Sequence, residues 1–169
     1  FVYGGRQLGK TALLRSIENE FHQPLSGQIG SFIDLKIEGL GKSKPINDLW
    51  PIIHEKLQQH GVIKSDIDFK KERNTRQQIK KWLGDDHKRR ILIFLDEADK
   101  FLEIDQKSSK DRDQFEMCSL LKGTMDETDQ RFKIVFAGLN NVLRTTQVSN
   151  HPLAHFGEPI CIGPMIANG

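Results

Sequence analysis

The stretch that most constrains the fold lies at the start of the chain, where the sequence reads FVYGGRQLGKTALLR. It matches the pattern G-x-x-x-x-G-K-[ST] at Gly4, Gly9, Lys10 and Thr11. The residues before the glycines are typical of a strand end, and the apolar positions after them have helical spacing. Glycines let the backbone approach a phosphate closely, and a helix start attracts anions. The stretch therefore predicts a phosphate-binding loop between a strand and a helix.

The chemistry of such a loop predicts a role for each residue. The backbone N–H groups of residues 5–11 would point at phosphate oxygens, Lys10 would reach the β- and γ-phosphates, and Thr11 would offer its hydroxyl to Mg²⁺. A tight strand-to-helix turn that carries a lysine by chance is the lesser alternative. The predicted nucleotide-binding set is Gly4, Gly5, Arg6, Gln7, Leu8, Gly9, Lys10, Thr11 and Ala12.

Strand-like and helix-like stretches alternate along the chain, which predicts an α/β fold with a mostly parallel sheet and helices on both sides. The run Ile-Leu-Ile-Phe-Leu at 91–95 is apolar without alternation, as in a strand covered on both faces. Leu13, Leu14, Ile17 and Phe21 share one face of the first helix, and Asn47 can cap a later one. We expect strands at 29–37, 91–95, 132–137 and 159–162, helices near 47–61, 75–83 and 115–125, and loops at 39–45, 64–74 and 108–113.

An acidic pair follows the apolar run at 91–95. Asp96 stands where a carboxylate would hold Mg²⁺ beside a phosphate loop, directly or through water. Glu97 could orient and deprotonate the water that attacks the γ-phosphate, as a general base. An acidic helix start would explain the pair if it stood alone. Together with Lys10 and Thr11, the pair predicts a site that binds and hydrolyses ATP with Mg²⁺.

These segments resemble a family. GGRQLGKT after an apolar strand, LIFLDEAD and VFAGLN look like the Walker A, Walker B and sensor-1 elements of the additional-strand P-loop ATPases, most of all the AAA+ and STAND-type group with its archaeal-type ATPases. The resemblance covers most of the chain. It implies a three-layer P-loop NTPase sandwich with a five-stranded sheet of order 5-1-4-3-2, the sensor strand lying between the Walker A and Walker B strands. It also places Asn140 near the γ-phosphate and the attacking water, while a plain Asn-Asn turn stays open as the alternative.

The resemblance also implies parts that the chain does not show. AAA+ proteins usually receive an arginine from a neighbouring subunit, and Arg144, the arginine between the sensor strand and the last strand, is better explained as a surface residue. We therefore expect one domain, 1–169, a nucleotide-binding core truncated at both ends, with the C-terminal lid and effector domains missing. The chain is expected to act as a nucleotide-driven switch or motor, and a STAND-like switch suits these features best. Hydrolysis by this piece alone is expected to be weak, and assembly into a homo-oligomer is compatible with these features.

The sequence leaves two other functions open. LDEADKFLE resembles the DEAD-box helicases, but their third motif is replaced here at 137–140, so Asp99 is expected to form a salt bridge or to cap the following segment. A nucleotide-binding scaffold without turnover is the other alternative. The sequence argues against it, because it retains the residues that hydrolysis needs: Lys10, Thr11, Asp96 and Glu97.

Composition adds limits. Apolar residues make up 37% of the chain, charged residues 28%, and no run is long enough to cross a membrane, which favours a cytoplasmic globular protein without membrane partners. Cys118 and Cys161 have no metal spacing and are expected to be small buried residues.

The segment between Lys70 and Arg90 contains nine Lys or Arg residues and three acidic residues, a surplus of six positive charges. A solvated helix face explains this surplus better than a nucleic-acid partner, because no aromatic residues accompany it. The six histidines show no metal spacing, and His151 and His155 are read as loop residues.

Overall fold

The computed structural model describes residues 1–64, 72–107, 115–139 and 156–163. Within these ranges, each of the first three strands is followed by one or two α-helices, so strands and helices are mixed along the chain as expected. The strands are β1 (Val2–Gly4), β2 (Gln28–Asp34), β3 (Arg90–Asp96), β4 (Phe132–Gly138) and β5 (Ile160–Ile162). The α-helices are α1 (Lys10–Phe21), α2 (Leu49–Gln59), α3 (Glu72–Gly84), α4 (Asp99–Lys107) and α5 (Glu116–Asp126).

The strands form one sheet in the order β2-β3-β4-β1-β5, and every neighbouring pair is parallel. Read from the other edge, this is the expected order 5-1-4-3-2, so the predicted fold is confirmed. β4 lies between β1 and β3. Because the carboxyl ends of parallel strands meet at one edge of a sheet, the segments that follow β1, β3 and β4 come together there.

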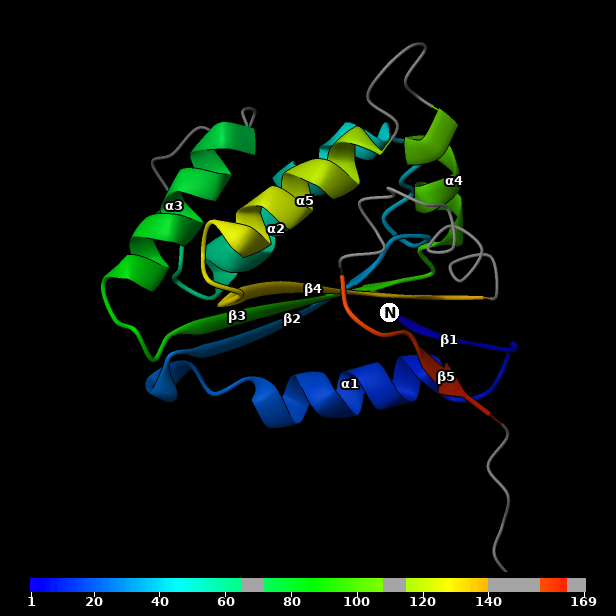
Figure 1. The fold of residues 1–169 in the computed structure, drawn as a ribbon, viewed down its shortest axis with the longest axis horizontal. Coiled ribbons are helices and arrows are strands. Elements are labelled where there is room, and N and C mark those ends of the chain that lie inside the picture. Colours follow the sequence, from blue (N-terminus) through cyan, green and yellow to red (C-terminus); the bar gives the residue numbers. More distant parts are fainter. Residues whose placement is uncertain (65–71, 108–114, 140–155, 164–169) are drawn as a thin grey trace, which may run out of the picture.

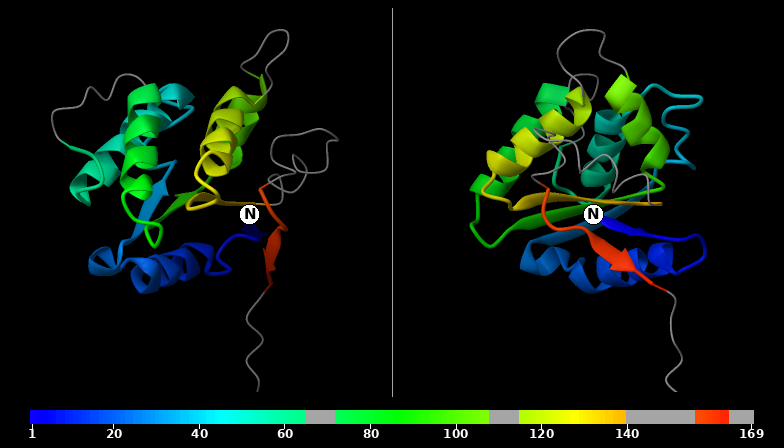
Figure 2. Two further views of the ribbon diagram at one scale, coloured as in Figure 1. Left: turned by 60° about the vertical axis from the view of Figure 1, so that its left-hand side comes forward. Right: turned by 45° about the vertical axis from the view of Figure 1, so that its right-hand side comes forward.

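Helices cover both faces of the sheet, which produces three layers (Figure 1). Among the described helices, α1 lies on one face and α2 to α5 lie on the other, as the two further views also show (Figure 2). The larger apolar core joins the sheet to the four helices and contains Trp50, Phe101 and Phe132. A smaller cluster joins the sheet to α1, with Leu14 packed among Phe32 and Phe94.

The apolar face predicted for α1 is wrong in part. Leu14 is fully buried, whereas Leu13 and Ile17 are 41% and 37% exposed. No other described helix lies beside α1 on its face of the sheet (Figure 1), so only a narrow stripe of α1 is covered.

Side chains near the end of α1 hold this helix on the edge strand β2. Glu18 Oε1 accepts the N–H of Phe32 at 2.7 Å, and His22 Nδ1 accepts the N–H of Gly30 at 3.2 Å. Arg15 lies over the ring of Phe32, with its guanidinium carbon 3.7 Å from the ring centroid. These contacts satisfy backbone donors that an edge strand otherwise leaves open, and they fix α1 relative to the sheet.

Strand β2 ends at Asp34 and not at residue 37 as expected. Asp34 Oδ1 accepts the N–H groups of Lys36 and Ile37, at 3.0 and 2.9 Å, which turns the chain out of the sheet. The apolar side chain of Ile37 is 81% exposed as a result. An asparagine- or aspartate-based turn therefore overrides the β propensity of the residues that follow it.

Two helix starts also differ from expectation. α2 begins at Leu49 with Asp48 as its N-cap, after a short 3-10 helix at Ile46–Asp48, so Asn47 is not the cap. α3 begins at Glu72, three residues before the expected start, so the end of the expected surface loop is helical. Residues 65–71 of that loop lie outside the described residues, as does the expected loop at 108–113.

The start of α5 depends on a buried carboxylate from α4. Asp105 is fully buried and accepts the N–H groups of Met117 and Cys118, at 3.0 and 2.9 Å. Cys118 is buried as expected. Its burial, and to a lesser extent its contact with Asp105, raises the pKa of its thiol well above the ordinary value.

Cys161 is exposed on the edge strand β5, so the expectation of burial is wrong there. In the described part of the chain, no helix combines the length and apolarity that a membrane crossing requires.

Candidate active site

The loop between β1 and α1 has the backbone that its glycines predict. Gly9 is the N-cap of α1 with φ of 81°, and Gln7 also has a positive φ, 61°. Gly4 serves a different purpose, because a Cβ there would lie 2.4 Å from the carbonyl oxygen of Ile162 on β5. Gly9 thus permits a left-handed turn, and Gly4 permits two strands to approach closely.

Lys10, at the first position of α1, folds back over the loop. Its Nζ donates to the carbonyl oxygens of Gly4 at 3.0 Å and of Gly5 at 2.7 Å. The ammonium group is therefore held at the mouth of the loop. Its hydrogen-bond donors point at oxygen acceptors that phosphate oxygens could replace.

Thr11 and Asp96 bring the loop and the end of β3 into direct contact. Thr11 Oγ1 donates to Asp96 Oδ2 at 2.5 Å, and the other carboxylate oxygen, Oδ1, accepts the N–H of Glu97 at 2.9 Å. Asp96 is only 2% exposed. A buried carboxylate needs such partners, so both of its oxygens are fixed in direction.

Glu97 projects from the turn between β3 and α4. It is exposed and has φ of 55°, in the left-handed region where residues other than glycine are uncommon. The next residue, Ala98, donates its N–H to the carbonyl oxygen of Ala137 on β4 at 2.9 Å. The turn is thus anchored on both sides, by Asp96 and by β4, with the Glu97 side chain free to face solvent.

These residues surround one cavity of about 580 Å³ at the carboxyl edge of the sheet. Of the predicted site residues, Gly4 and Gly5 contribute carbonyl groups that bind Lys10 and do not line the cavity itself. The structure thus brings the expected loop and the acidic pair to one place. The cavity is lined by Arg6, Gln7, Leu8, Gly9, Lys10, Thr11, Ala12, Lys36, Asp96, Glu97 and Leu139.

Two lining residues, Lys36 and Leu139, were missed by reasoning from the sequence. Lys36 comes two residues after the end of β2, and Leu139 comes directly after β4. The signal was their position: a residue just after a parallel strand lies at the same edge as the phosphate loop. Without the early end of β2 at Asp34, Lys36 would count as part of a strand.

The predicted sensor residue Asn140 lies outside the described residues, as do Arg144, His151 and His155. The strand that leads to Asn140 has the expected place, because β4 separates β1 from β3. Asp99, at the first position of α4, accepts the N–H of Leu139 through Oδ2 at 2.8 Å. Asp99 therefore ties α4 to the end of β4. In the described part of the chain it forms no salt bridge, and it does not cap its own helix, so the expected roles are not found there.

The oxygen donors of Thr11 and Asp96 suit Mg²⁺, a hard cation that is held by one or two protein oxygens together with phosphate oxygens and water. Among the described residues, no group of three or more His, Cys, Asp or Glu side chains is placed to hold a metal ion. The two oxygen donors of Thr11 and Asp96 fit a metal ion that is bound together with a nucleotide.

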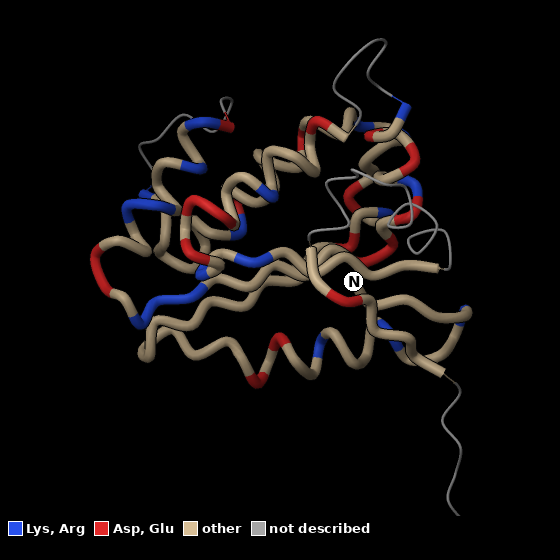
Figure 3. Tube along the Cα trace, in the orientation of Figure 1, with Lys and Arg blue, Asp and Glu red and all other residues tan. Residues whose placement is uncertain are grey.

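The described part of the basic stretch between residues 70 and 90 does not form a uniform patch. Lys and Arg gather on α3 and on the turn into β3, with acidic residues among them (Figure 3). Glu127, after α5, pairs with both Arg76 and Lys80 of α3. Arg89 pairs with Asp85 and lies over the Trp82 ring, 4.7 Å from its centroid. Asp85 is already counted in the surplus of six, so of these pairs only those with Glu127 offset part of it.

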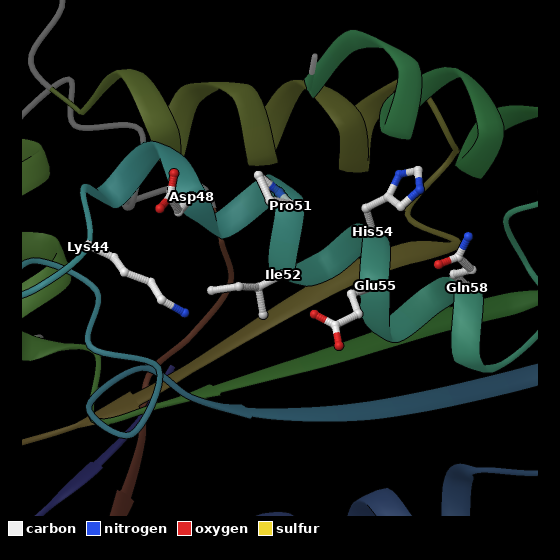
Figure 4. A pocket seen from close by; sticks show the side chains of 7 residues that line it. All are labelled: Lys44, Asp48, Pro51, Ile52, His54, Glu55 and Gln58. Carbon is white, nitrogen blue, oxygen red and sulfur yellow. The ribbon is translucent and has the colours of Figure 1, made fainter. Parts of the chain in front are cut away.

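A second pocket, of about 530 Å³, lies along α2 (Figure 4). Lys44, Asp48, Glu55 and Gln58 line it, together with Pro51, Ile52 and His54. His54 is directed at α3, where its Nδ1 lies 3.0 Å from Thr75 Oγ1. This pocket belongs to one helix and the loop before it, and no residue of the phosphate loop contributes to it.

Residues 1–151 match the model of a protein family described as "ATPase family associated with various cellular activities (AAA)". A search of curated proteins gave no significant match. The chain is similar in structure to the ORC1 protein of Aeropyrum pernix in complex with DNA, with a TM-score of 0.61, 16% identity, and coverage of 98% of this chain and 39% of that one.

It is also similar to the ORC2 protein of Aeropyrum pernix in ADPNP–ADP complexes, with a TM-score of 0.63, 12% identity, and coverage of 95% of this chain and 40% of the other. The chain thus spans about two fifths of the length of these structural relatives. The structural likeness shows a shared fold, and the family model covers most of the sequence. The chain therefore belongs to the AAA family of ATPases.

Proposed function

We propose that this chain binds ATP with Mg²⁺ and hydrolyses it, and that it acts as a nucleotide-driven switch within a larger protein. Membership of the AAA family supports nucleotide-dependent ATPase activity in general. The observation that carries the specific proposal is the contact between Thr11 and Asp96, beside Lys10 and Glu97, in one cavity. A tight turn with a lysine by chance would not require a buried carboxylate from β3 beside the loop.

In this proposal the phosphate loop binds the triphosphate. Lys10 exchanges its contacts with the Gly4 and Gly5 carbonyls for phosphate oxygens, and the backbone N–H groups of the loop and of the α1 start add further donors. Lys10 needs no large movement for this exchange, because its ammonium group already lies over the loop.

Thr11 and Asp96 would hold the metal, either directly or through its water shell. A metal ion held there would supply positive charge that offsets the charge of the phosphates. The two side chains are already in contact, so the protein spends little conformational entropy on assembling this half of the site.

Glu97 would act on the attacking water. Its carboxylate is exposed in the cavity and can accept a proton from that water as general base. Asn140 is proposed to hold the same water through its amide group. Leu139, the residue before it, lines the cavity, which supports this placement.

Two substitutions test the proposal. Lys10→Ala should abolish ATP binding measured by calorimetry, while Lys42→Ala, an exposed lysine outside the cavity, should leave it unchanged. Glu97→Gln should keep ATP bound and stop phosphate release. Glu103→Gln, at a carboxylate of α4 that pairs with Lys100, should leave both ATP binding and phosphate release unchanged. Unchanged ATP affinity in the Lys10→Ala protein would refute the phosphate-loop assignment.

The same assays separate the alternatives. A scaffold without turnover would bind ATP and release no phosphate even with Glu97 intact. A nucleic-acid-dependent motor would show turnover stimulated by DNA or RNA, a test made pertinent by the relative that is in complex with DNA. A switch would hydrolyse ATP slowly and without stimulation by single- or double-stranded substrates.

A further inference from the structure

Three cationic side chains line the cavity, and the proposed function so far uses only one of them. They are Lys10, Arg6 and Lys36, and the carboxylates of Asp96 and Glu97 line the same cavity. Lys10 is bound to the loop carbonyls, and Asp96 to Thr11 and to the N–H of Glu97. The side chains of Arg6 and Lys36 are exposed and make no hydrogen bond or ion pair with the described part of the chain.

Arg6 is the better placed of the two for the terminal phosphate. It lies inside the loop, four residues before Lys10, and Gln7 reverses the chain directly after it with φ of 61°. Because the loop amides are proposed to bind the phosphates, the backbone of Arg6 lies beside them and its side chain borders the same cavity. Lys36 instead comes from the turn after β2, which is the edge strand and is separated from β1 by two strands.

We propose that the Arg6 guanidinium binds the γ-phosphate of ATP and stabilises the charge that develops during hydrolysis, within the same chain. This inference rests on the proposed function of the site. It means that the core carries its own transition-state arginine and does not depend on one from a neighbouring subunit. A planar guanidinium with five N–H donors suits this role, because it can bind two phosphate oxygens at once.

The chemical step shows where the charge is needed. The water oxygen forms a bond to the γ-phosphorus, and the bond from that phosphorus to the β–γ bridging oxygen breaks. ADP leaves with the bonding electron pair, and Glu97 accepts the proton of the water. Negative charge therefore grows on the bridging oxygen and spreads over the γ-phosphate oxygens, where Arg6 would neutralise it.

Nucleotide binding provides a test that does not depend on turnover. In the full chain, Arg6→Ala should weaken ATP binding several-fold, leave ADP binding unchanged, and abolish the extra retention of ADP by aluminium fluoride, a mimic of the transferring phosphoryl group. Arg6→Lys should keep part of the ATP preference, because it keeps the charge but loses the two-point contact. Arg73→Ala, at an exposed arginine of α3 outside the cavity, is the matched control. Equal loss of ATP and ADP affinity would overturn the proposal, because the contact would then not be to the γ-phosphate.

Turnover distinguishes an arginine in the same chain from one in a neighbour. Arg6→Ala should lower kcat by about 1,000-fold or more, the effect expected of a transition-state arginine. The unsubstituted protein should show the same kcat at every protein concentration. A mixture of the Arg6→Ala and Glu97→Gln proteins should stay inactive, since each lacks a group that its own site needs. Recovered activity in the mixture would overturn the proposal.

The inference and the proposed function fail in different ways. If the unsubstituted protein neither binds nor hydrolyses ATP, the proposed function is wrong and this inference falls with it. If the unsubstituted protein does both and Arg6→Ala behaves identically, only the role of Arg6 is wrong.

Discussion

Thr11 Oγ1 lies 2.5 Å from Asp96 Oδ2, although 85 positions separate the two residues in the sequence. The contact joins the phosphate loop to the end of the most apolar strand of the sheet. It depends on the strand order, because β4 holds β1 and β3 apart while their carboxyl ends share one edge.

Removal of the Thr11 hydroxyl should affect both stability and the metal. Thr11→Val leaves one oxygen of the buried Asp96 carboxylate without its donor, which should lower the free energy of unfolding by about 1–3 kcal/mol. Thr11→Ser keeps the hydroxyl and should stay close to the original protein. In calorimetry, the gain in ATP affinity on adding Mg²⁺ should be lost in Thr11→Val and kept in Thr11→Ser. A Thr11→Val protein with the full Mg²⁺ effect would contradict the assignment.

The left-handed backbone of Glu97 predicts that the side chain needed for turnover lowers the stability of the fold. With φ of 55°, a side chain costs about 1–2 kcal/mol in this region, and glycine does not incur the cost. Glu97→Gly and Glu97→Ala both remove the carboxylate, so both should lose turnover. Glu97→Gly should be the more stable of the two by about 1 kcal/mol in denaturant unfolding. Equal stabilities would mean that this turn stores no strain.

Asp99 should position the end of β4. Asp99→Ala removes the acceptor for the Leu139 N–H, so exchange of that amide hydrogen with solvent should become faster. Because Leu139 lines the cavity, we also expect kcat to fall while ADP affinity stays the same.

Asp99→Asn keeps an acceptor oxygen and should restore slow exchange of the Leu139 amide. Glu103→Ala serves as the control on the same helix, since its carboxylate contacts only exposed lysines. A fall in kcat without faster exchange would assign Asp99 a different role.

His60 should make the protein less stable in acid. The pKa of His60 is lowered mainly by burial and, to a lesser extent, by the positive charge that the neighbouring His22 can carry. Lys56 also lowers this pKa, whereas Glu18 raises it. The unfolded chain then binds a proton at a pH where the folded chain does not, so the free energy of unfolding falls as pH drops through the ordinary histidine pKa of about 6.5. The loss levels off below the lowered pKa of the folded protein.

His60→Gln should therefore reduce the difference in melting temperature between pH 8 and pH 5. The same substitution at the exposed His87 is the control. An unchanged difference in the His60→Gln protein would mean that protonation of His60 is not resisted by the fold.

Local patterns in the sequence were sufficient for the fold class. Each of these patterns involves only a few adjacent residues: the apolar run before Asp96, the glycines before Lys10, and the change between strand and helix periodicity along the chain. The strand order followed from resemblance to a family, and the structure confirms it. The boundaries were harder, because a turn such as the one at Asp34 competes with strand propensity over only two or three residues.

The sequence by itself was enough to select the residues that we propose for a phosphate and metal site, since those residue types and spacings have few other uses. Only the tertiary structure decided which side chains share the cavity with them. Lys36 and Leu139 come from strand ends that are remote in sequence, and their place depends on parallel pairing across the whole sheet. The tie between Asp99 and Leu139 has the same origin. Contacts of this kind arise from the packing of distant segments, which no local pattern records.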